Sequence, residues 1–247
     1  MPTESDFQLA RESASLAGKL LMLLRKSASD SDVPSSTLGE IADKESHELL
    51  CGLILDVSPD DAILSEEQED DLKRLDSNRV WIIDPLDGTK EFGETDRSDW
   101  AVHVALVEGG IPTVGAVAMP DIGTTFCSND PSLPLKEITE IRITSSRTRP
   151  VPAAQIIADE LSGEIILMGS AGAKAMAVVK GDAEIYVHTG GQYEWDSCAP
   201  VAVALANGLH ASKLDGSPLL YNQRNTYLPE LLICRKELAD SVLAIFN

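Results

Sequence analysis

Basic residues are scarce in this sequence: 20 Lys and Arg stand against 40 Asp and Glu, which gives a formal net charge of −20. Nucleic-acid polymers and anionic membranes are bound through basic surfaces, so the charge argues against both kinds of partner. The sequence also lacks any run near the roughly 20 apolar residues of a membrane span, and its opening MPTESDFQLARES has no apolar signal core. We therefore expect a soluble cytoplasmic protein whose phosphorylated ligands, if any, need cations between ligand and protein.

Cysteine and histidine are sparse as well, with four of each. The cysteines show no CxxC spacing and the histidines no HExxH pair, so we expect no zinc site. Without a secretion signal, the cysteines are expected to be reduced and mostly buried.

The remaining composition is that of a globular protein, with 43% apolar and 24% charged residues over 247 positions. Around SNDPSLPLKE the chain becomes polar and contains proline, which is typical of a domain boundary. We therefore expect an N-terminal domain over residues 1–132 and a C-terminal domain over residues 133–247.

Hydrophobic periodicity predicts the secondary structure of both halves. In the first half, a helix over 6–26 ends at the turn-rich SDSDVPSS, and a second helix begins near Ala42 and continues to Leu53. RVWIIDPLDGTKEF reads as a buried strand, a turn and the start of a helix. Trp100–Val107 and two runs in GIPTVGAVAMPDIGTTFCS read as strands. In the second half, EIRIT, EIILM, AEIYVH and LLICR alternate with helices over 171–179, 197–206 and 239–246. This pattern predicts an α+β N-terminal part and an α/β C-terminal part.

The segment IIDPLDGT is the first candidate for chemistry. Asp84 and Asp87 follow a hydrophobic strand, and Gly88 and Thr89 begin a helix directly behind them. Divalent ions such as Mg²⁺ prefer oxygen ligands, and the amides of a helix N-terminus favour an anion, so this segment could hold metal and phosphate together. The alternative is a turn in which Asp87 only caps a helix.

Two further acidic features lie elsewhere in the chain. Glu66 and Glu67 follow a short apolar run, and Glu194 and Asp196 flank a tryptophan before an apolar helix. Taken singly, the first is a solvated loop and the second a helix cap. Together with DPLDGT they favour a metal cluster. A covalent aspartyl-phosphate route, as in haloacid dehalogenase phosphatases, is disfavoured because their DxDGT has one residue between the aspartates and DPLDGT has two.

The order and spacing of these motifs resemble the lithium-sensitive, magnesium-dependent phosphatases related to inositol monophosphatase. The resemblance runs from the AD of EIADKES to GSPLLYN. TKEF after DG, and MGSAGAKAMAVVKGDAEIYVH, are similar to the 3'(2'),5'-bisphosphate nucleotidases of that family. The resemblance implies a layered α-β-α-β-α sandwich and an enzyme that hydrolyses the 3'-phosphate of adenosine 3',5'-bisphosphate to give AMP. It also implies two or three Mg²⁺ ions, inhibition by Li⁺ and a possible homodimer.

The resemblance also implies roles for individual residues. The expected metal ligands are Glu66, Asp84, the carbonyl of Leu86, Asp87 and Asp196. Asp43 and Thr89 would orient and deprotonate the attacking water, with Glu67 in support. The expected substrate-binding residues are Gly88, Thr89, Lys90, Ser170, Lys174, His188 and Glu194.

Three departures from the family pattern affect these expectations. The segment from GS to Lys174 is one residue longer than usual, so Ser170 and Ala171 compete for one role. Gly39 and Glu40 stand where relatives carry Val-Thr, and His188 stands where they often carry arginine, so it is either a substrate contact or a polar residue at a strand end. Two other functions stay open: a broader inositol-phosphate or fructose 1,6-bisphosphate phosphatase, and a non-catalytic phosphate- or nucleotide-binding regulator.

Overall fold

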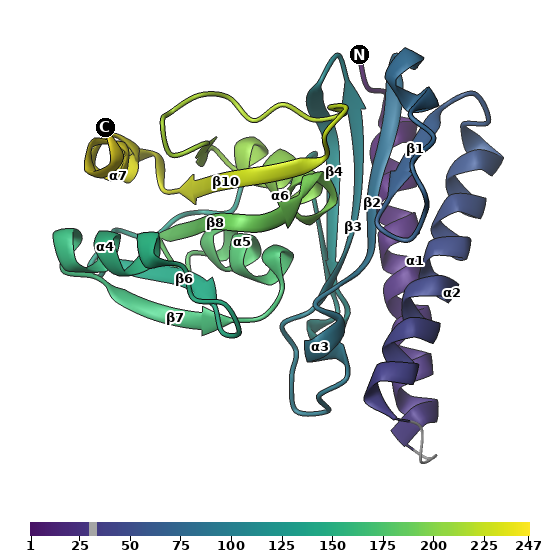
Figure 1. Ribbon diagram of the computed structural model, residues 1–247, viewed down its shortest axis with the longest axis horizontal. Helices are drawn as coiled ribbons and strands as arrows, with labels where there is room; N and C mark the ends of the chain where they lie inside the picture. Colours follow the sequence, from purple (N-terminus) through teal and green to yellow (C-terminus); the bar gives the residue numbers. More distant parts are fainter. Residues whose placement is uncertain (30–33) are drawn as a thin grey trace.

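The computed structural model describes residues 1–29 and 34–247. Helices α1 (Glu4–Ser29) and α2 (Ser35–Val57) lie side by side at one end of the molecule (Figure 1). The second helix begins at Ser35, one residue after Pro34, and not near Ala42 as predicted. The turn predicted within SDSDVPSS falls largely on residues 30–33, outside the described residues.

The first sheet packs against these two helices. Its strands lie in the order β1-β2-β3-β4-β5, with β1 parallel to β2 and the other pairs antiparallel. The strands are β1 (Ala62–Ser65), β2 (Arg79–Asp87), β3 (Ala101–Glu108), β4 (Ile111–Met119) and β5 (Thr124–Cys127). Alternate residues of β2 serve opposite cores: Trp81 and Ile83 pack with α1 and α2, and Val80 and Ile82 with the helices beyond the sheet. Burial on both faces explains the unbroken apolar run in the sequence.

The second sheet has the order β7-β6-β8-β10-β9. Its strands are β6 (Arg142–Ser146), β7 (Glu164–Met168), β8 (Ile185–Tyr193), β9 (His210–Ser212) and β10 (Tyr227–Cys234). Strand β6 is parallel to β7 and β8, and β10 is antiparallel to β8 and β9.

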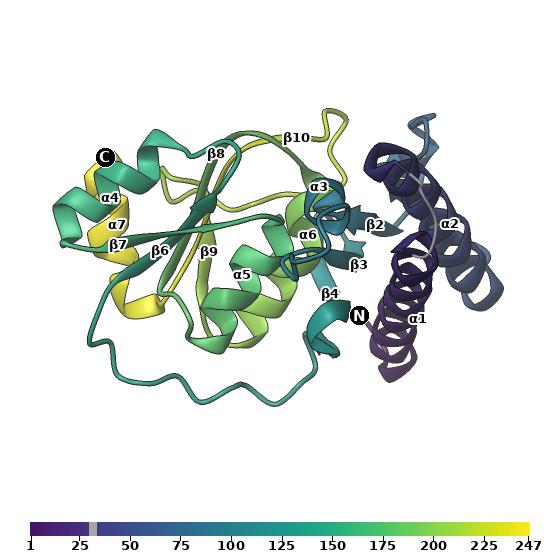
Figure 2. The same ribbon diagram turned by 90° about the horizontal axis from the view of Figure 1, so that it is seen from below.

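Helices fill the space between the sheets and cover the far face of the second one. Helices α5 (Ala171–Lys180) and α6 (Glu194–Ala206) lie between the sheets, and α4 (Pro152–Leu161) and α7 (Ala239–Phe246) lie outside (Figures 1 and 2). The short elements are α3 (Thr89–Phe92), η1 (Lys73–Asp76), η2 (Pro120–Ile122) and η3 (Lys236–Leu238). The expected α-β-α-β-α sandwich is therefore confirmed, with α4 as an additional helix that the sequence pattern did not predict.

The connection between the sheets lies where the domain boundary was predicted. Residues 128–141 contain no helix or strand and run along the outside of the molecule (Figure 2). Helix α6, from the second half, nevertheless packs on β4 so closely that a Cβ at Gly115 would lie 2.6 Å from the carbonyl oxygen of Ala199. One core thus crosses the boundary, and the division into two domains stays a prediction.

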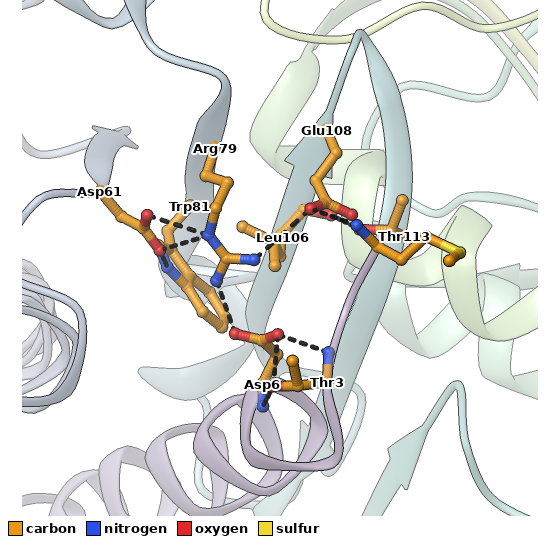
Figure 3. A network of polar contacts seen from close by, with 9 residues as sticks. Thr3, Asp6, Asp61, Arg79, Trp81, Leu106, Glu108 and Thr113 are labelled. Carbon is orange, nitrogen blue, oxygen red and sulfur yellow. Dashed lines mark hydrogen bonds and ion pairs between the residues drawn. The ribbon is translucent and has the colours of Figure 1, made fainter.

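A polar network fixes α1 to the first sheet at the end where β2 begins, which we call the sheet edge (Figure 3). Arg79, at the start of β2, donates to the carboxylates of Asp61 and Asp6 at 3.0 and 2.6 Å. Trp81 donates its indole N–H to Asp61 at 2.9 Å, and Thr3 donates its backbone N–H to Asp6 at 2.6 Å. The buried charge of Asp6 is therefore fully paired.

Two observations bear on the absences noted in the sequence. All four cysteines are free, and Cys127, Cys198 and Cys234 are buried as expected. Among the described residues, no helix is long and apolar enough to cross a membrane.

Candidate active site

The end of β2 forms the base of the site. Its pairing with β3 shifts between Asp84 and Asp87, and the backbone N–H of Leu86 donates to the Asp84 carboxylate at 3.2 Å. Gly88 follows with φ +90°, a left-handed conformation that favours glycine, and a Cβ there would lie 3.0 Å from the Cβ of Ser170. The chain can therefore turn sharply into α3 while the second half of the protein approaches closely.

A cavity of about 230 Å³ opens at this turn. It brings together residues from both halves of the chain that the sequence singled out: Glu66, Asp84, Leu86, Asp87, Gly88, Thr89, Lys90, Ser170, Lys174, His188 and Asp196. A larger groove of about 660 Å³ between α1 and the β4–β5 connection has one carboxylate, Asp121, in its lining, so it offers no comparable cluster. The smaller cavity is the candidate site.

The carboxylates that the sequence singled out in this cavity have no lysine or arginine ion-pair partner among the described residues. Burial, followed by repulsion from Glu66, Asp87 and Asp196, raises the pKa of Asp84 well above its usual range. Burial and repulsion from Asp87 raise the pKa of Asp196 to about 6. Among the described residues, no lysine or arginine forms an ion pair with any of these carboxylates.

Glu66 contributes to the same repulsion from the end of β1. Its residue surface is exposed, yet protein atoms crowd the carboxylate, and this desolvation, with repulsion from Asp196 and Asp43, raises its pKa to about 8. Asp84 is buried and Asp196 half-buried, neither has a lysine or arginine ion-pair partner among the described residues, and together with Glu66 they form an oxygen-rich site suited to hard divalent cations such as Mg²⁺.

Asp87 has a different environment from the other carboxylates. Its oxygens accept the backbone N–H groups of Ala171 and Gly172 at 3.1 and 2.7 Å, at the start of α5. The hypothesis that Asp87 caps the helix directly after it is wrong, because Gly88 occupies that cap position and Asp87 serves α5 instead. Burial acts to raise its pKa, but His103, Lys174 and the Gly172 amide lower it.

His103 is a site residue that the sequence reasoning missed. The ring is fully buried, with Nε2 3.2 Å from the Asp87 carboxylate and Nδ1 3.1 Å from the carbonyl oxygen of Trp195. Asp84, Asp87 and His103 offer ligand atoms that all lie within 4.8 Å of one another. The available signal was a single histidine inside the otherwise apolar strand WAVHVALV.

The predicted water-activating pair is brought together from α2 and α3. The Thr89 hydroxyl lies 3.4 Å from the Asp43 carboxylate and 3.3 Å from the carbonyl oxygen of Leu86. Burial and the neighbouring Glu67 raise the pKa of Asp43 to about 7. The departure at Gly39 has a steric reason here, since a Cβ at that position would lie 2.6 Å from the Thr89 methyl group.

Ser170 and Lys174 build the start of α5. Ser170 is the N-cap and accepts the Ala173 N–H at 2.9 Å. The ammonium group of Lys174 donates to the carbonyl oxygens of Gly169 and Ser170, which leaves one of its three N–H donors for the cavity it lines. Burial lowers the pKa of Lys174 to about 8.

His188 lies within β8 and not at a strand end. Burial, followed by repulsion from Lys174, lowers its pKa to about 4, so the ring is neutral at physiological pH. Two further residues that the sequence reasoning missed, Arg149 and Gln192, line the cavity beside it.

Glu194 does not line the cavity. Its buried carboxylate accepts the backbone N–H groups of Asn222 and Gln223 at 2.6 and 2.7 Å. The substrate contact predicted for Glu194 therefore has no support in the geometry, and this residue instead holds the 222–223 segment. Asp196, two residues later, accepts the Tyr193 N–H at 2.7 Å and faces the cavity, so it is both a helix cap and a site residue.

Comparisons with known proteins agree with this geometry. A sequence model of the inositol monophosphatase family matches residues 3–247. A 3'-phosphoadenosine 5'-phosphate phosphatase from Mycobacterium leprae is 45% identical, with 98% of this chain and 94% of that protein covered. A 3'(2'),5'-bisphosphate nucleotidase CysQ from Escherichia coli O157:H7 is 30% identical over 90% of this chain and 94% of its own length.

Solved structures show the same fold. The crystal structure of CysQ from Bacteroides thetaiotaomicron superposes with a TM-score of 0.79 at 24% identity, covering 94% of this chain and 98% of that one. The family is magnesium-dependent in general, which fits the buried acidic group described above. The chain belongs to the inositol monophosphatase family.

Proposed function

We propose that this protein is a magnesium-dependent phosphatase that hydrolyses the 3'-phosphate of adenosine 3',5'-bisphosphate, giving AMP and phosphate. The observation that carries the proposal is the convergence of Glu66, Asp84, Asp87 and Asp196 on one cavity with no lysine or arginine paired to them among the described residues. Carboxylates held this close together are stable only when protons or cations neutralise their charge, and cations can also bind a phosphate group.

The metal would be held by the side chains of Glu66, Asp84, Asp87 and Asp196 and by the carbonyl of Leu86. Bound Mg²⁺ supplies a water of lowered pKa and stabilises negative charge on the phosphoryl oxygens. We propose two or three ions and inhibition by Li⁺. His103 Nε2 lies 3.2 Å from Oδ2 of Asp87 and thereby helps fix the orientation of that carboxylate.

The protein's own residues account for the remaining requirements of the reaction. Thr89, hydrogen-bonded to Asp43, is placed to receive the proton of the attacking water and pass it to that carboxylate. Glu67 adjoins this pair and raises the pKa of Asp43, which makes Asp43 a better proton acceptor. The amides of Gly88 and Thr89, at the turn into α3, would hold the phosphate.

The identity of the substrate is supported by the names of the relatives and by the basic residues that line the cavity. Relatives 45% and 48% identical to this chain carry the name 3'-phosphoadenosine 5'-phosphate phosphatase. The cavity is also lined by three positively charged residues, Lys90, Lys174 and Arg149. A substrate with two phosphates can therefore place one phosphate at the metal cluster and the other at these basic residues.

Phosphate release tests the proposal. Purified protein is assayed with adenosine 3',5'-bisphosphate, inositol 1-phosphate and fructose 1,6-bisphosphate, with Mg²⁺, without it, and with added Li⁺. The expected result is a preference for the nucleotide that is lost without Mg²⁺ and suppressed by Li⁺. Equal rates on the sugar phosphates would contradict the substrate, and nucleotide binding without phosphate release would indicate a regulator. Cytoplasmic localisation and a homodimer stay predictions.

A further inference from the structure

Two buried polar atoms in the cavity have no hydrogen-bond partner among the described residues: Nε2 of His188 and Oε1 of Gln192. Their side chains are only 5% and 4% exposed, and both line the cavity. An unpaired polar atom in such a place costs free energy that a bound ligand would recover. The pair therefore points to a ligand with hydrogen-bonding groups of its own.

The side chain of Gln192 is held from one end. Its amide nitrogen donates to the Tyr186 hydroxyl at 2.7 Å, and Tyr186 is fully buried with the Lys174 ammonium 5.4 Å from its ring centroid. The amide is thus fixed, and its other end is left free. This arrangement pre-organises one acceptor and keeps its position when the cavity fills.

The positively charged side chain of Arg149 lies near the two unpaired atoms. Arg149, from the loop between β6 and α4, is exposed and forms no ion pair with any described residue. Its guanidinium lies against β8 at Gly191, where φ is +82° and a Cβ would lie 3.0 Å from Nη1. Its backbone N–H donates to the Ser146 hydroxyl at 3.2 Å, which fixes the loop. Gly191 thus leaves room for a positive charge beside His188 and Gln192.

We infer that Arg149, His188 and Gln192 form a subsite that selects nucleoside bisphosphates. His188 and Gln192 hydrogen-bond to the nucleoside, and Arg149 pairs with the phosphate that is not hydrolysed. The inference rests on the proposed function, because it assumes that the other phosphate lies at the carboxylate cluster. It assigns substrate preference to residues of the second sheet and its loop, away from the metal ligands.

Substrate pairs that differ by one group test the subsite. We expect Arg149→Ala to lower kcat/KM for adenosine 3',5'-bisphosphate by about 10- to 100-fold, the effect of one charge-assisted contact. The same variant should leave 3'-AMP, which lacks the second phosphate, within about twofold. Gln192→Met should lower kcat/KM for both nucleotides by about tenfold or more, a larger factor than for inositol 1-phosphate, which has no nucleoside.

Controls separate a local effect from charge and folding. Arg224→Ala removes one exposed cation outside the cavity lining and should not change the ratio of the two nucleotide rates. Arg149→Lys should restore part of the preference for the bisphosphate. Melting temperatures show whether Gln192→Met folds, and AMP binding by calorimetry gives a readout that does not depend on turnover.

The outcomes distinguish this inference from the proposed function. If the wild-type protein releases no phosphate from the nucleotide, the proposed function fails. If it does, but Arg149→Ala loses equal activity on both nucleotides or on neither, the subsite is overturned. Unchanged AMP affinity in Gln192→Met would likewise remove Gln192 from it.

Discussion

Aspartates in two regions of the first half of the protein differ in one respect, the presence of a basic partner. At the sheet edge, Asp6 is buried and receives hydrogen bonds from Arg79 and Thr3 (Figure 3). Burial acts to raise its pKa, but these hydrogen bonds bring it below the usual range. Asp84 in the cavity, and Asp43 beside it, are also buried, have no lysine or arginine ion-pair partner among the described residues, and have raised pKa values.

The carboxylates of the proposed metal site therefore require a source of positive charge from outside the protein. The fold pairs an arginine with a carboxylate that has only a structural role, and among the described residues it pairs none with the four carboxylates of that site. Their charge can be balanced by protons or by metal ions, but only metal ions also supply positive charge that binds a phosphate substrate. The excess of acidic residues in the whole chain strengthens this requirement.

The largest effect is expected from removing one cavity carboxylate. Asp84→Asn should lower kcat/KM by about three orders of magnitude, because a bound metal contributes several kcal/mol to the transition state. Without Mg²⁺, the same variant should melt at a higher temperature than wild type, since it relieves repulsion. A lower melting temperature in the metal-free state would show that repulsion does not dominate there.

A smaller effect is expected from the water-activating pair. Thr89→Ala should lower kcat by about two orders of magnitude, the usual contribution of a general acid–base group. Stabilisation by Mg²⁺ should be retained, because Thr89 contributes no carboxylate to the cluster. Thr89→Ser keeps the hydroxyl and is the matched control. Turnover unchanged in the alanine variant would remove Thr89 from the mechanism.

The smallest effect is expected at the sheet edge. Asp6→Asn should lower the free energy of unfolding by about 1–3 kcal/mol at neutral pH, because it weakens charge-assisted hydrogen bonds. Since the pKa of Asp6 is lowered on folding, this stability is present above the unfolded-state pKa of about 4 and is lost as pH falls through the folded-state value. Wild type and variant should therefore converge in acid. A constant difference down to pH 2 would contradict the pairing, and activity should not change.

The sequence predicted those elements whose pattern is local. The apolar run before DPLDGT and the Gly-Thr after it determine β2, the turn and the short helix. The early start of α2 was missed because Gly39 and Glu40 interrupt its apolar pattern, although Gly39 lies inside the helix against Thr89. The ten-residue helix α4 was missed because it begins at Pro152, directly after a proline-containing loop, and proline reads as a helix breaker although it is tolerated in the first turn of a helix.

The candidate site likewise contains residues that were predicted from the sequence and residues that were missed. The acidic motifs were predicted from their own residues and the Asp43–Thr89 pair through family resemblance, but their convergence is a long-range property that no local pattern contains. His103 and Arg149 were missed because the residues that they lie against, Trp195 and Gly191, are distant in sequence. Gln192 was missed although Tyr186, which holds it, is only six residues away. Glu194 has the residue type of a ligand, but its position directs the carboxylate to the backbone of the 222–223 segment.

The most direct test of this account is the melting temperature of metal-free protein titrated with MgCl₂ against NaCl at equal ionic strength. The account predicts saturable stabilisation by Mg²⁺ beyond that of NaCl, as for a ligand that binds only the folded state, and its loss in Asp84→Asn. Equal shifts with both salts, or an unchanged Mg²⁺ response in Asp84→Asn, would contradict the claim that these carboxylates form a metal site.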